Sequence, residues 1–158
     1  QLSPTSQKGR ITCTSHYGSL EEPVNPLLYV LAYGAGFVAQ ASPTDLVGMA
    51  SIIEEAIRYP GFAFVNIQSP CVTYGEEAQQ IKGLKAISES LAALGHDPAD
   101  RLAAMDLAQQ YGQKMHLGVF YRNPEPPPTY DAMLRERQAE LSKGAPSRDR
   151  ILDLFIKK

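Results

Sequence analysis

Apolar residues along the chain gather in short runs that alternate with longer amphipathic segments. Residues 37–40 (FVAQ), 62–68 (FAFVNIQ) and 115–121 (MHLGVFY) are compact and mostly apolar, which is typical of buried strands. The segments between them space their apolar residues more widely, in a way that favours helices. Strands that alternate with helices predict an α/β fold with a parallel sheet flanked by helices and right-handed crossovers.

The predicted helices of the first part of the chain have clear start and stop signals. Asn25 is a good N-cap and Pro26 fits the first helical position, so the apolar run LLYVLAYGA predicts a short buried helix. Ser42–Pro43 predicts the start of a second helix, which Tyr59-Pro60-Gly61 ends. Its apolar residues at near-helical spacing are Leu46, Met49, Ile53 and Ile57. Together with its two flanking strands this helix predicts a βαβ unit.

Four further helices are expected after the second strand. We expect one from about Glu77 to Leu94 and one that Asp97–Pro98 caps and that runs to Gln110, with Leu102 among its apolar positions. Thr129 and Ser147 predict the caps of the last two helices, and the final one presents an apolar stripe of Ile151, Leu154 and Phe155.

The domain organisation follows from these elements. The first 22 residues are rich in Ser, Thr, Gly and Pro and predict a long loop. We expect one sheet-containing domain over residues 1–122 and a proline-rich linker with a helical C-terminal tail over residues 123–158. The charged segment 135–140 (RERQAE) is expected to be a solvated helix face with ion pairs, although a contact with a partner stays open.

Composition narrows the function classes. The chain has 158 residues, of which 44% are hydrophobic and 20% charged, and its net charge of -2 offers no basic surface for nucleic acid. No apolar run approaches the ~20 residues that span a bilayer. We therefore expect a soluble, cytoplasmic protein that binds neither nucleic acid nor membrane.

Two cysteines are the main candidates for chemistry. Cys71 follows a proline directly after the second strand, where parallel sheets gather their ligands. A packed thiol, a ligand of a soft metal and a solitary nucleophile all stay open for it. Cys13 and His16 have a spacing that zinc sites use, but without a second pair of ligands a packed or incidental thiol is favoured. We assign no chemistry to His96 or His116.

Four segments in order carry a resemblance to a known family. They are QLSPTS at 1–6, EEPVNPLLYVLAYGAGFVAQA at 21–41, GFAFVNIQSPCVTYG at 61–75 and LGVFYRNPEPPPTY at 117–130. In this order they resemble the β subunit of 2-oxoacid:ferredoxin oxidoreductases, and they correspond to its C-terminal half. The chain departs from the family at Gln40, where arginine is frequent, and at Gly75, where asparagine is frequent.

The resemblance implies a partial thiamine-diphosphate-binding fold and a set of cofactors. In that family the subunit binds thiamine diphosphate through Mg²⁺ and carries one [4Fe–4S] cluster. Cys71 corresponds to the fourth cluster ligand, and the other three would lie upstream of Gln1. The residues implied in the cofactor or substrate pocket, for which a plain loop-capping role is equally open, are Gln1, Ser3, Pro4, Thr5 and Ser6. No catalytic side chain is assigned.

The resemblance also implies an activity. Such an enzyme, with its α subunit, oxidatively decarboxylates a 2-oxoacid such as pyruvate or 2-oxoglutarate. Coenzyme A takes the acyl group, CO₂ is released, and the electrons pass through the cluster to ferredoxin. The first residue is Gln1 and the earliest methionine is Met49, so we expect an upstream part of the subunit and no activity from this chain alone. The alternatives are a non-catalytic interaction module that keeps the fold, and a thiamine-dependent decarboxylase without an iron–sulfur cluster.

Overall fold

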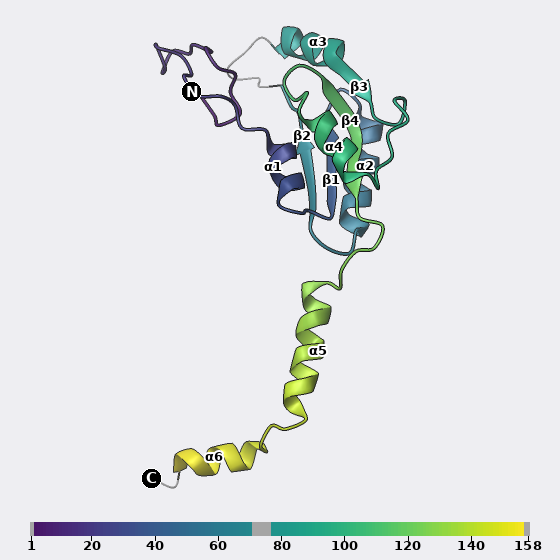
Figure 1. Ribbon diagram of the computed structural model, residues 1–158. Coiled ribbons are helices and arrows are strands. Elements are labelled where there is room, and N and C mark those ends of the chain that lie inside the picture. The colour runs from purple at the N-terminus through teal and green to yellow at the C-terminus, as the bar shows by residue number, and fades with distance from the viewer. Residues whose placement is uncertain (1, 71–76, 157–158) are drawn as a thin grey trace. The chain divides into compact units, whose positions relative to one another are not determined.

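The computed structural model describes residues 2–70 and 77–156, which divide into two compact units, Gln1–Pro126 and Pro127–Lys158 (Figure 1). The helices of the first unit are α1 (Pro26–Ala32), α2 (Leu46–Arg58), α3 (Glu77–Ile87) and α4 (Arg101–Ala108). Its strands are β1 (Phe37–Ala41), β2 (Ala63–Ile67), β3 (Ser88–Ser90) and β4 (Met115–Arg122). The second unit holds α5 (Tyr130–Ser142) and α6 (Arg148–Ile156).

The four strands form one sheet in the order β2-β1-β4-β3, with β1 and β4 as the two inner strands. β1 and β2 are parallel and linked by α2, so the predicted βαβ unit is confirmed. β4 runs antiparallel to β1, and β3 runs parallel to β4. The prediction of a purely parallel sheet is therefore wrong, and the sheet is mixed. The tight turn after α4 brings Met115 to the edge where β1 ends, and β4 must run back along β1 from there.

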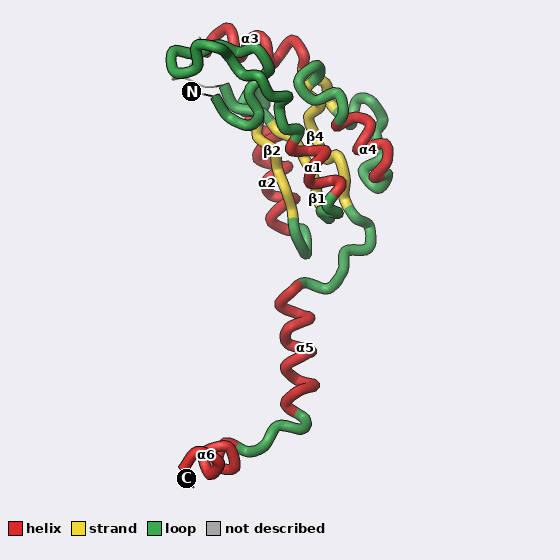
Figure 2. The backbone as a smooth tube through the Cα atoms, turned by 60° about the vertical axis from the view of Figure 1, so that its left-hand side comes forward, coloured by secondary structure: helices red, strands yellow, loops and turns green. Residues whose placement is uncertain are grey.

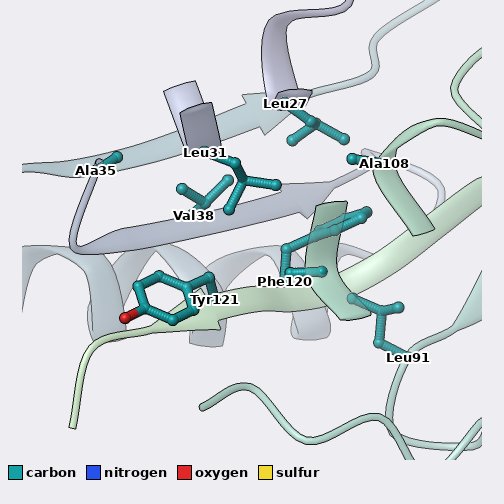
Figure 3. Close-up of a cluster of buried hydrophobic side chains, with 9 residues drawn as sticks. Leu27, Leu31, Ala35, Val38, Leu91, Ala108, Phe120 and Tyr121 are labelled. Atoms are coloured by element: carbon teal, nitrogen blue, oxygen red, sulfur yellow. The ribbon is translucent and has the colours of Figure 1, made fainter. Parts of the chain in front are cut away.

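Helices cover both faces of this sheet. All five residues of β1 are buried, and its four apolar residues divide between two clusters on opposite faces, as the alternation of side chains along a strand requires. Val38 packs with Leu27, Leu31 and Phe120 on the side of α1 and α4 (Figure 3). Phe37, Ala39 and Ala41 pack with Ile52 of α2 on the other side. Figure 2 shows α2 across the strands from α1.

The predicted start of α1 is confirmed, and that of α2 is shifted. Asn25 accepts a hydrogen bond from the N–H of Leu28 at 3.1 Å, with Pro26 at the first helical position. α2 begins later than expected, because Asp45 and not Ser42 is its N-cap and accepts from the N–H of Gly48 at 3.0 Å. Ser42 instead donates to the carbonyl oxygen of Gln68, directly beyond β2.

The helix expected to continue to Leu94 ends at Ile87. Residues 88–90 form strand β3 and pair with Met115–Leu117 of β4. The local sequence pattern does not indicate this long-range pairing. α4 is shorter than expected and is capped by Asp100, while Asp97 forms a turn with the N–H of Ala99.

Several apolar positions expected to pack are exposed in the described residues. In α2, Ile52 is buried, whereas Leu46 and Ile57 are exposed, and in α4 Leu102 is exposed. α1 buries Leu27 and Leu31 but exposes Tyr29, and its C-cap Tyr33 is exposed as well, so it is only partly the buried helix that the sequence predicts.

The second unit consists of two helices with the predicted caps. Thr129 accepts from the N–H of Ala132 and Ser147 accepts from the N–H of Arg150. The charged segment of α5 is a solvated face with ion pairs, as expected, between Arg135 and Asp131 and between Arg137 and Glu140. Neither helix has a buried residue. No helix in the described parts of the chain combines the length and apolar character that crossing a membrane needs.

Candidate functional site

A cavity of about 180 Å³ lies at the edge of the sheet where β1 and β2 end. In parallel α/β units this edge is where ligands gather. The first loop and the turn before β4 line it together with the strand ends. The lining residues are Thr5, Gln7, Pro23, Gln40, Gln68, Leu84, Ile87, Tyr111, Gly112, Lys114 and Met115.

Gln40 is the central polar residue of this edge. Its side chain is 1% exposed, and its amide nitrogen donates to the carbonyl oxygen of His116 on β4 at 2.9 Å. Its amide oxygen accepts from Asn66 Nδ2 on β2 at 2.7 Å and, at a long 3.5 Å, from Gln68 Nε2. One neutral side chain therefore joins β1 to both of its neighbouring strands, and its buried polar atoms are satisfied.

Gln68 is held from several directions directly after β2. Its N–H donates to the carbonyl oxygen of Ala41 at 2.9 Å, and its own carbonyl oxygen accepts from Ser42 Oγ at 3.1 Å. Its side-chain nitrogen donates to the hydroxyl oxygen of Tyr111 at 2.8 Å. These bonds fix both the backbone and the side chain of Gln68 at the cavity wall.

Three ionisable side chains among the described residues lie near the cavity: Lys114, Glu89 and His116. Lys114 Nζ lies 3.0 Å from Glu89 Oε2, and His116 Nδ1 lies 3.5 Å from the same oxygen. His116 Nε2 faces the amide oxygen of Gln110 at 3.1 Å, so the proton of the neutral ring belongs on Nε2. Burial lowers the pKa of His116 below its ordinary value, and the carboxylate of Glu89 only partly opposes this. The ring is therefore neutral at pH 7, which agrees with Nδ1 having no hydrogen-bond partner among the described residues.

The first loop closes one side of the cavity, and its hydroxyls bond mainly to one another. Ser3 N–H donates to Ser6 Oγ at 2.8 Å, and Ser3 Oγ lies 3.1 Å from the hydroxyl oxygen of Thr5. Pro4 accepts from the N–H of Val24, which ties the loop to the segment before α1. Of the expected pocket residues in this loop, Thr5 lines the cavity, whereas Ser3, Pro4 and Ser6 shape the turn that carries it. Gln1 lies outside the described residues.

The residues expected to bind metal are not brought together in the described part of the chain. Cys71 lies outside the described residues, and so does Gly75. Cys13 is exposed, and the described residues contain no group of three or more His, Cys, Asp or Glu side chains that could hold a metal ion. The described residues that line the cavity include no carboxylate, and they offer neutral amides, hydroxyls and one ammonium group to a ligand. Such a lining suits the oxygen atoms of a polar ligand better than a divalent cation.

Sequence reasoning missed Gln68, Tyr111 and Lys114 as members of this site. Gln68 could have been found, because it is a polar residue directly after an apolar strand. Gln40 is likewise a polar residue within an apolar strand. Tyr111 and Lys114 belong to the turn that opens β4, and the antiparallel direction of that strand brings them to the cavity.

Three comparisons relate the chain to known proteins. A family model described as the C-terminal part of the pyruvate ferredoxin oxidoreductase beta subunit matches residues 71–138. The chain is 29% identical to subunit beta of 2-oxoacid:ferredoxin oxidoreductase 1 from Aeropyrum pernix, over 92% of this chain and 48% of that protein. It is 28% identical to the 2-oxoglutarate synthase subunit KorB of Methanothermobacter marburgensis, over 80% of this chain and 44% of that protein.

Among solved structures, the chain is similar to a 2-oxoglutarate:ferredoxin oxidoreductase from Magnetococcus marinus, which has 2-oxoglutarate, coenzyme A and succinyl-CoA bound. The TM-score is 0.85 at 34% identity, and the match covers 100% of this chain and 53% of the other. The chain spans about half the length of the curated relatives that it matches over most of its own length.

Proposed function

Because the chain belongs to the β subunits of the 2-oxoacid:ferredoxin oxidoreductase family, we propose that it is part of an enzyme of that activity. The complete enzyme converts a 2-oxoacid and coenzyme A into acyl-CoA and CO₂ and passes the electrons to ferredoxin. This chain contributes the part of the β subunit that holds the sheet edge with Gln40 and Gln68. The α subunit is its partner.

The observation that carries the proposal is the structural match over the whole of the chain at 34% identity. Identity at this level over an entire chain goes with a shared fold, and a shared fold alone would not carry a function. Here the matched relatives are named as subunits of 2-oxoacid:ferredoxin oxidoreductase or 2-oxoglutarate synthase. The cavity of this chain also lies at the edge of the sheet where such folds bind ligands.

The cofactors belong to the same proposal, together with a thiamine-diphosphate-binding fold that this chain completes in part. When bound, thiamine diphosphate supplies the electron sink for loss of CO₂ and a [4Fe–4S] cluster carries the electrons away. The described residues do not form a ligand set for Mg²⁺ or for the cluster. We therefore assign those ligands to the rest of the subunit, with Cys71 as the contribution of this chain.

The described residues have binding and shielding roles in this proposal. Gln40, Gln68 and Tyr111 form a neutral wall with fixed hydrogen-bond geometry, which positions a polar ligand without adding charge. Thr5 and Gln7 of the first loop line the cavity from the other side, and in this proposal they shield the bound ligand from water. His116 does not line the cavity, so we give it no role in proton transfer.

The C-terminal tail, residues 123–158 in the expected division, is proposed to contact the α subunit. Its helices expose large apolar side chains, among them Leu154 at 70% and Phe155 at 79%. Water-exposed apolar residues gathered in one short unit are typical of a surface that a partner covers.

The experiment that tests the proposal uses the two cysteines as a matched pair in the complete complex. Cys71→Ser is expected to remove most of the low-temperature electron paramagnetic resonance signal of the reduced cluster and most of the ferredoxin reduction. Cys13→Ser is the control, because Cys13 is exposed and no metal-binding group of the described residues includes it. If Cys71→Ser keeps both the signal and ferredoxin reduction at the level of Cys13→Ser, the cluster assignment is wrong.

A further inference from the structure

Lys114 is the one ionised side chain among the described residues that line the cavity at the sheet edge. Its ammonium group lies 3.0 Å from Glu89 Oε2, and Glu89 itself is not among the described lining residues. An ammonium group has three N–H donors, and a single carboxylate oxygen takes one of them. Glu89 therefore holds Lys114 at the cavity, while two N–H donors of Lys114 remain for a ligand.

Tyr111 offers a second donor in the cavity lining. Its hydroxyl oxygen accepts from Gln68 Nε2 at 2.8 Å, so the proton of the hydroxyl group is not used in that bond. The described residues provide no acceptor for this proton. Because a phenol hydroxyl both donates and accepts, Tyr111 can donate to a ligand while its bond with Gln68 keeps the hydroxyl group in place.

One tight turn brings both donors to the cavity. The N–H groups of Gln113 and Lys114 both donate to the carbonyl oxygen of Gln110 at 2.9 Å, and a backbone bridge pairs Tyr111 with Lys114. Gly112 lies between these two residues at φ +86°, a conformation that residues with a side chain rarely adopt. Since Tyr111 and Lys114 both line the cavity, this turn places a phenol and an ammonium group in the same lining.

The chemistry of this lining selects an oxyanion. The other polar groups of the described lining residues are neutral, and Glu89 balances the charge of Lys114 from outside the lining. A ligand therefore meets the ammonium group and not the carboxylate, and oxyanions form the stronger, charge-assisted hydrogen bonds with such a donor. At about 180 Å³ the cavity is smaller than the ~300–1,000 Å³ of pockets that enclose drug-sized ligands. It suits a small acid or the charged end of a larger molecule.

We propose that Lys114 and Tyr111 form an oxyanion subsite, which takes either the carboxylate that every 2-oxoacid carries or a phosphate group of coenzyme A. Lys114 supplies the charge, and Tyr111 supplies a directed hydrogen bond. Binding at a group that does not change in the reaction is equally strong in the ground state and the transition state, so the subsite sets KM and not kcat. The inference rests on the proposed function, because both ligands are substrates of that reaction.

The test compares Lys114→Met with Glu89→Gln in the complete complex, by steady-state ferredoxin reduction. Both variants break the same ion pair, but only Lys114→Met removes the ammonium group. Lys114→Met is expected to raise the KM of one substrate by about 10–100-fold and to change kcat by less than about 3-fold. Glu89→Gln should leave that KM unchanged or lower it, because the ammonium group stays and loses its competing partner. Lys85→Met is the control, since Lys85 is exposed on α3 and is not among the described lining residues.

The substrate whose KM rises identifies the ligand. A higher KM for the 2-oxoacid alone assigns the subsite to the carboxylate, and a higher KM for coenzyme A alone assigns it to a phosphate group. If Lys114→Met reduces ferredoxin with both KM values of Lys85→Met, the inference is overturned and the proposed function stands. An equal rise in Lys114→Met and Glu89→Gln also overturns the inference, because the ion pair then acts only through the fold. A rise in both KM values of Lys114→Met has the same consequence, since it marks a general distortion of the site.

Tyr111→Phe tests the second donor. It should raise the same KM by a smaller factor, about 2–10-fold, because a neutral hydrogen bond is weaker than one from a charged group. A KM equal to that of Lys85→Met would overturn the role of Tyr111.

A binding measurement keeps the subsite separate from the proposed function. If no 2-oxoacid lets the unmodified complex reduce ferredoxin, the proposed function fails, and the complex is titrated calorimetrically with oxalate and with pyrophosphate. Binding of either anion that is weaker in Lys114→Met than in Lys85→Met supports the subsite. Equal binding in the two variants, or no binding by the unmodified complex, overturns it.

Discussion

Replacing Gln40 by leucine tests the polar network of the sheet edge at its centre. Gln40 is 1% exposed and bonds to groups on both neighbouring strands. Leucine has a similar volume and fills the space, so the main change is the loss of the amide group. The carbonyl oxygen of His116 and the amide of Asn66 then lose their partner, while Gln68 keeps its bond to Tyr111.

The expected loss of stability follows from the two groups that lose a hydrogen bond, the carbonyl oxygen of His116 and the amide of Asn66. A buried polar group that loses its partner costs about 1–3 kcal/mol, and a part-buried one costs less because water reaches it. The carbonyl oxygen of His116 is buried and Asn66 is half-buried, so we expect the free energy of unfolding to fall by about 2–4 kcal/mol. Gln40→Glu should be at least as harmful, because its carboxylate cannot donate to the carbonyl oxygen of His116 and would bury a charge.

The assay is urea unfolding followed by circular dichroism, with Gln109→Leu as the matched control. Gln109 is exposed at the end of α4, and the same substitution there should change the free energy of unfolding by less than about 0.5 kcal/mol. If Gln40→Leu is as stable as the control variant, the network does not hold the sheet edge and the reasoning is refuted.

Three other predictions address different parts of the molecule. His116 is 2% exposed and burial lowers its pKa, so the unfolded chain takes up its proton first, and the free energy of unfolding should fall as the pH drops below 6.5. The slope of the free energy of unfolding against pH is at most about 1.4 kcal/mol per pH unit for one such group. His116→Gln should reduce this slope, measured by urea unfolding between about pH 7 and 5. A slope equal to that of the unmodified chain would contradict the prediction. Arg101→Met removes the hydrogen bonds to the carbonyl oxygens of Leu31 and Ala35 and the contact with the Tyr121 ring. The free energy of unfolding should therefore fall by about 2–4 kcal/mol. Arg58→Met, at an exposed position, should lower it by less than about 0.5 kcal/mol. Deleting residues 147–158 should weaken recovery of the α subunit with this chain while its thermal midpoint stays unchanged; undiminished recovery would contradict the proposed contact.

Features that depend on a few neighbouring residues could be predicted from the sequence. Asn25, Thr129 and Ser147 cap helices as expected, because an N-cap bond joins residues only two or three apart. The βαβ unit from Phe37 to Ile67 was also predictable, since its strands are short apolar runs between clear turn signals.

Features that depend on distant pairing could not be predicted. The apolar run of β4 is the same whether the strand is parallel or antiparallel, so its direction was open until the turn at Tyr111 was placed. Residues 88–90 were assigned to a helix because only their pairing with β4 makes them a strand. The cavity depends on the direction of β4, because a hydrogen bond in its wall joins Gln68 to Tyr111, 43 positions apart in the sequence.

The measurement that tests the central claim most directly is ferredoxin reduction by the native complex isolated through this chain. With coenzyme A and a 2-oxoacid present, the account predicts that reduced ferredoxin accumulates, and that omitting either substrate abolishes it. Pyruvate, 2-oxoglutarate and a branched-chain 2-oxoacid are tested separately, because the described residues do not discriminate among them. An intact complex that reduces ferredoxin with none of the three would contradict the assignment of this chain to a 2-oxoacid:ferredoxin oxidoreductase.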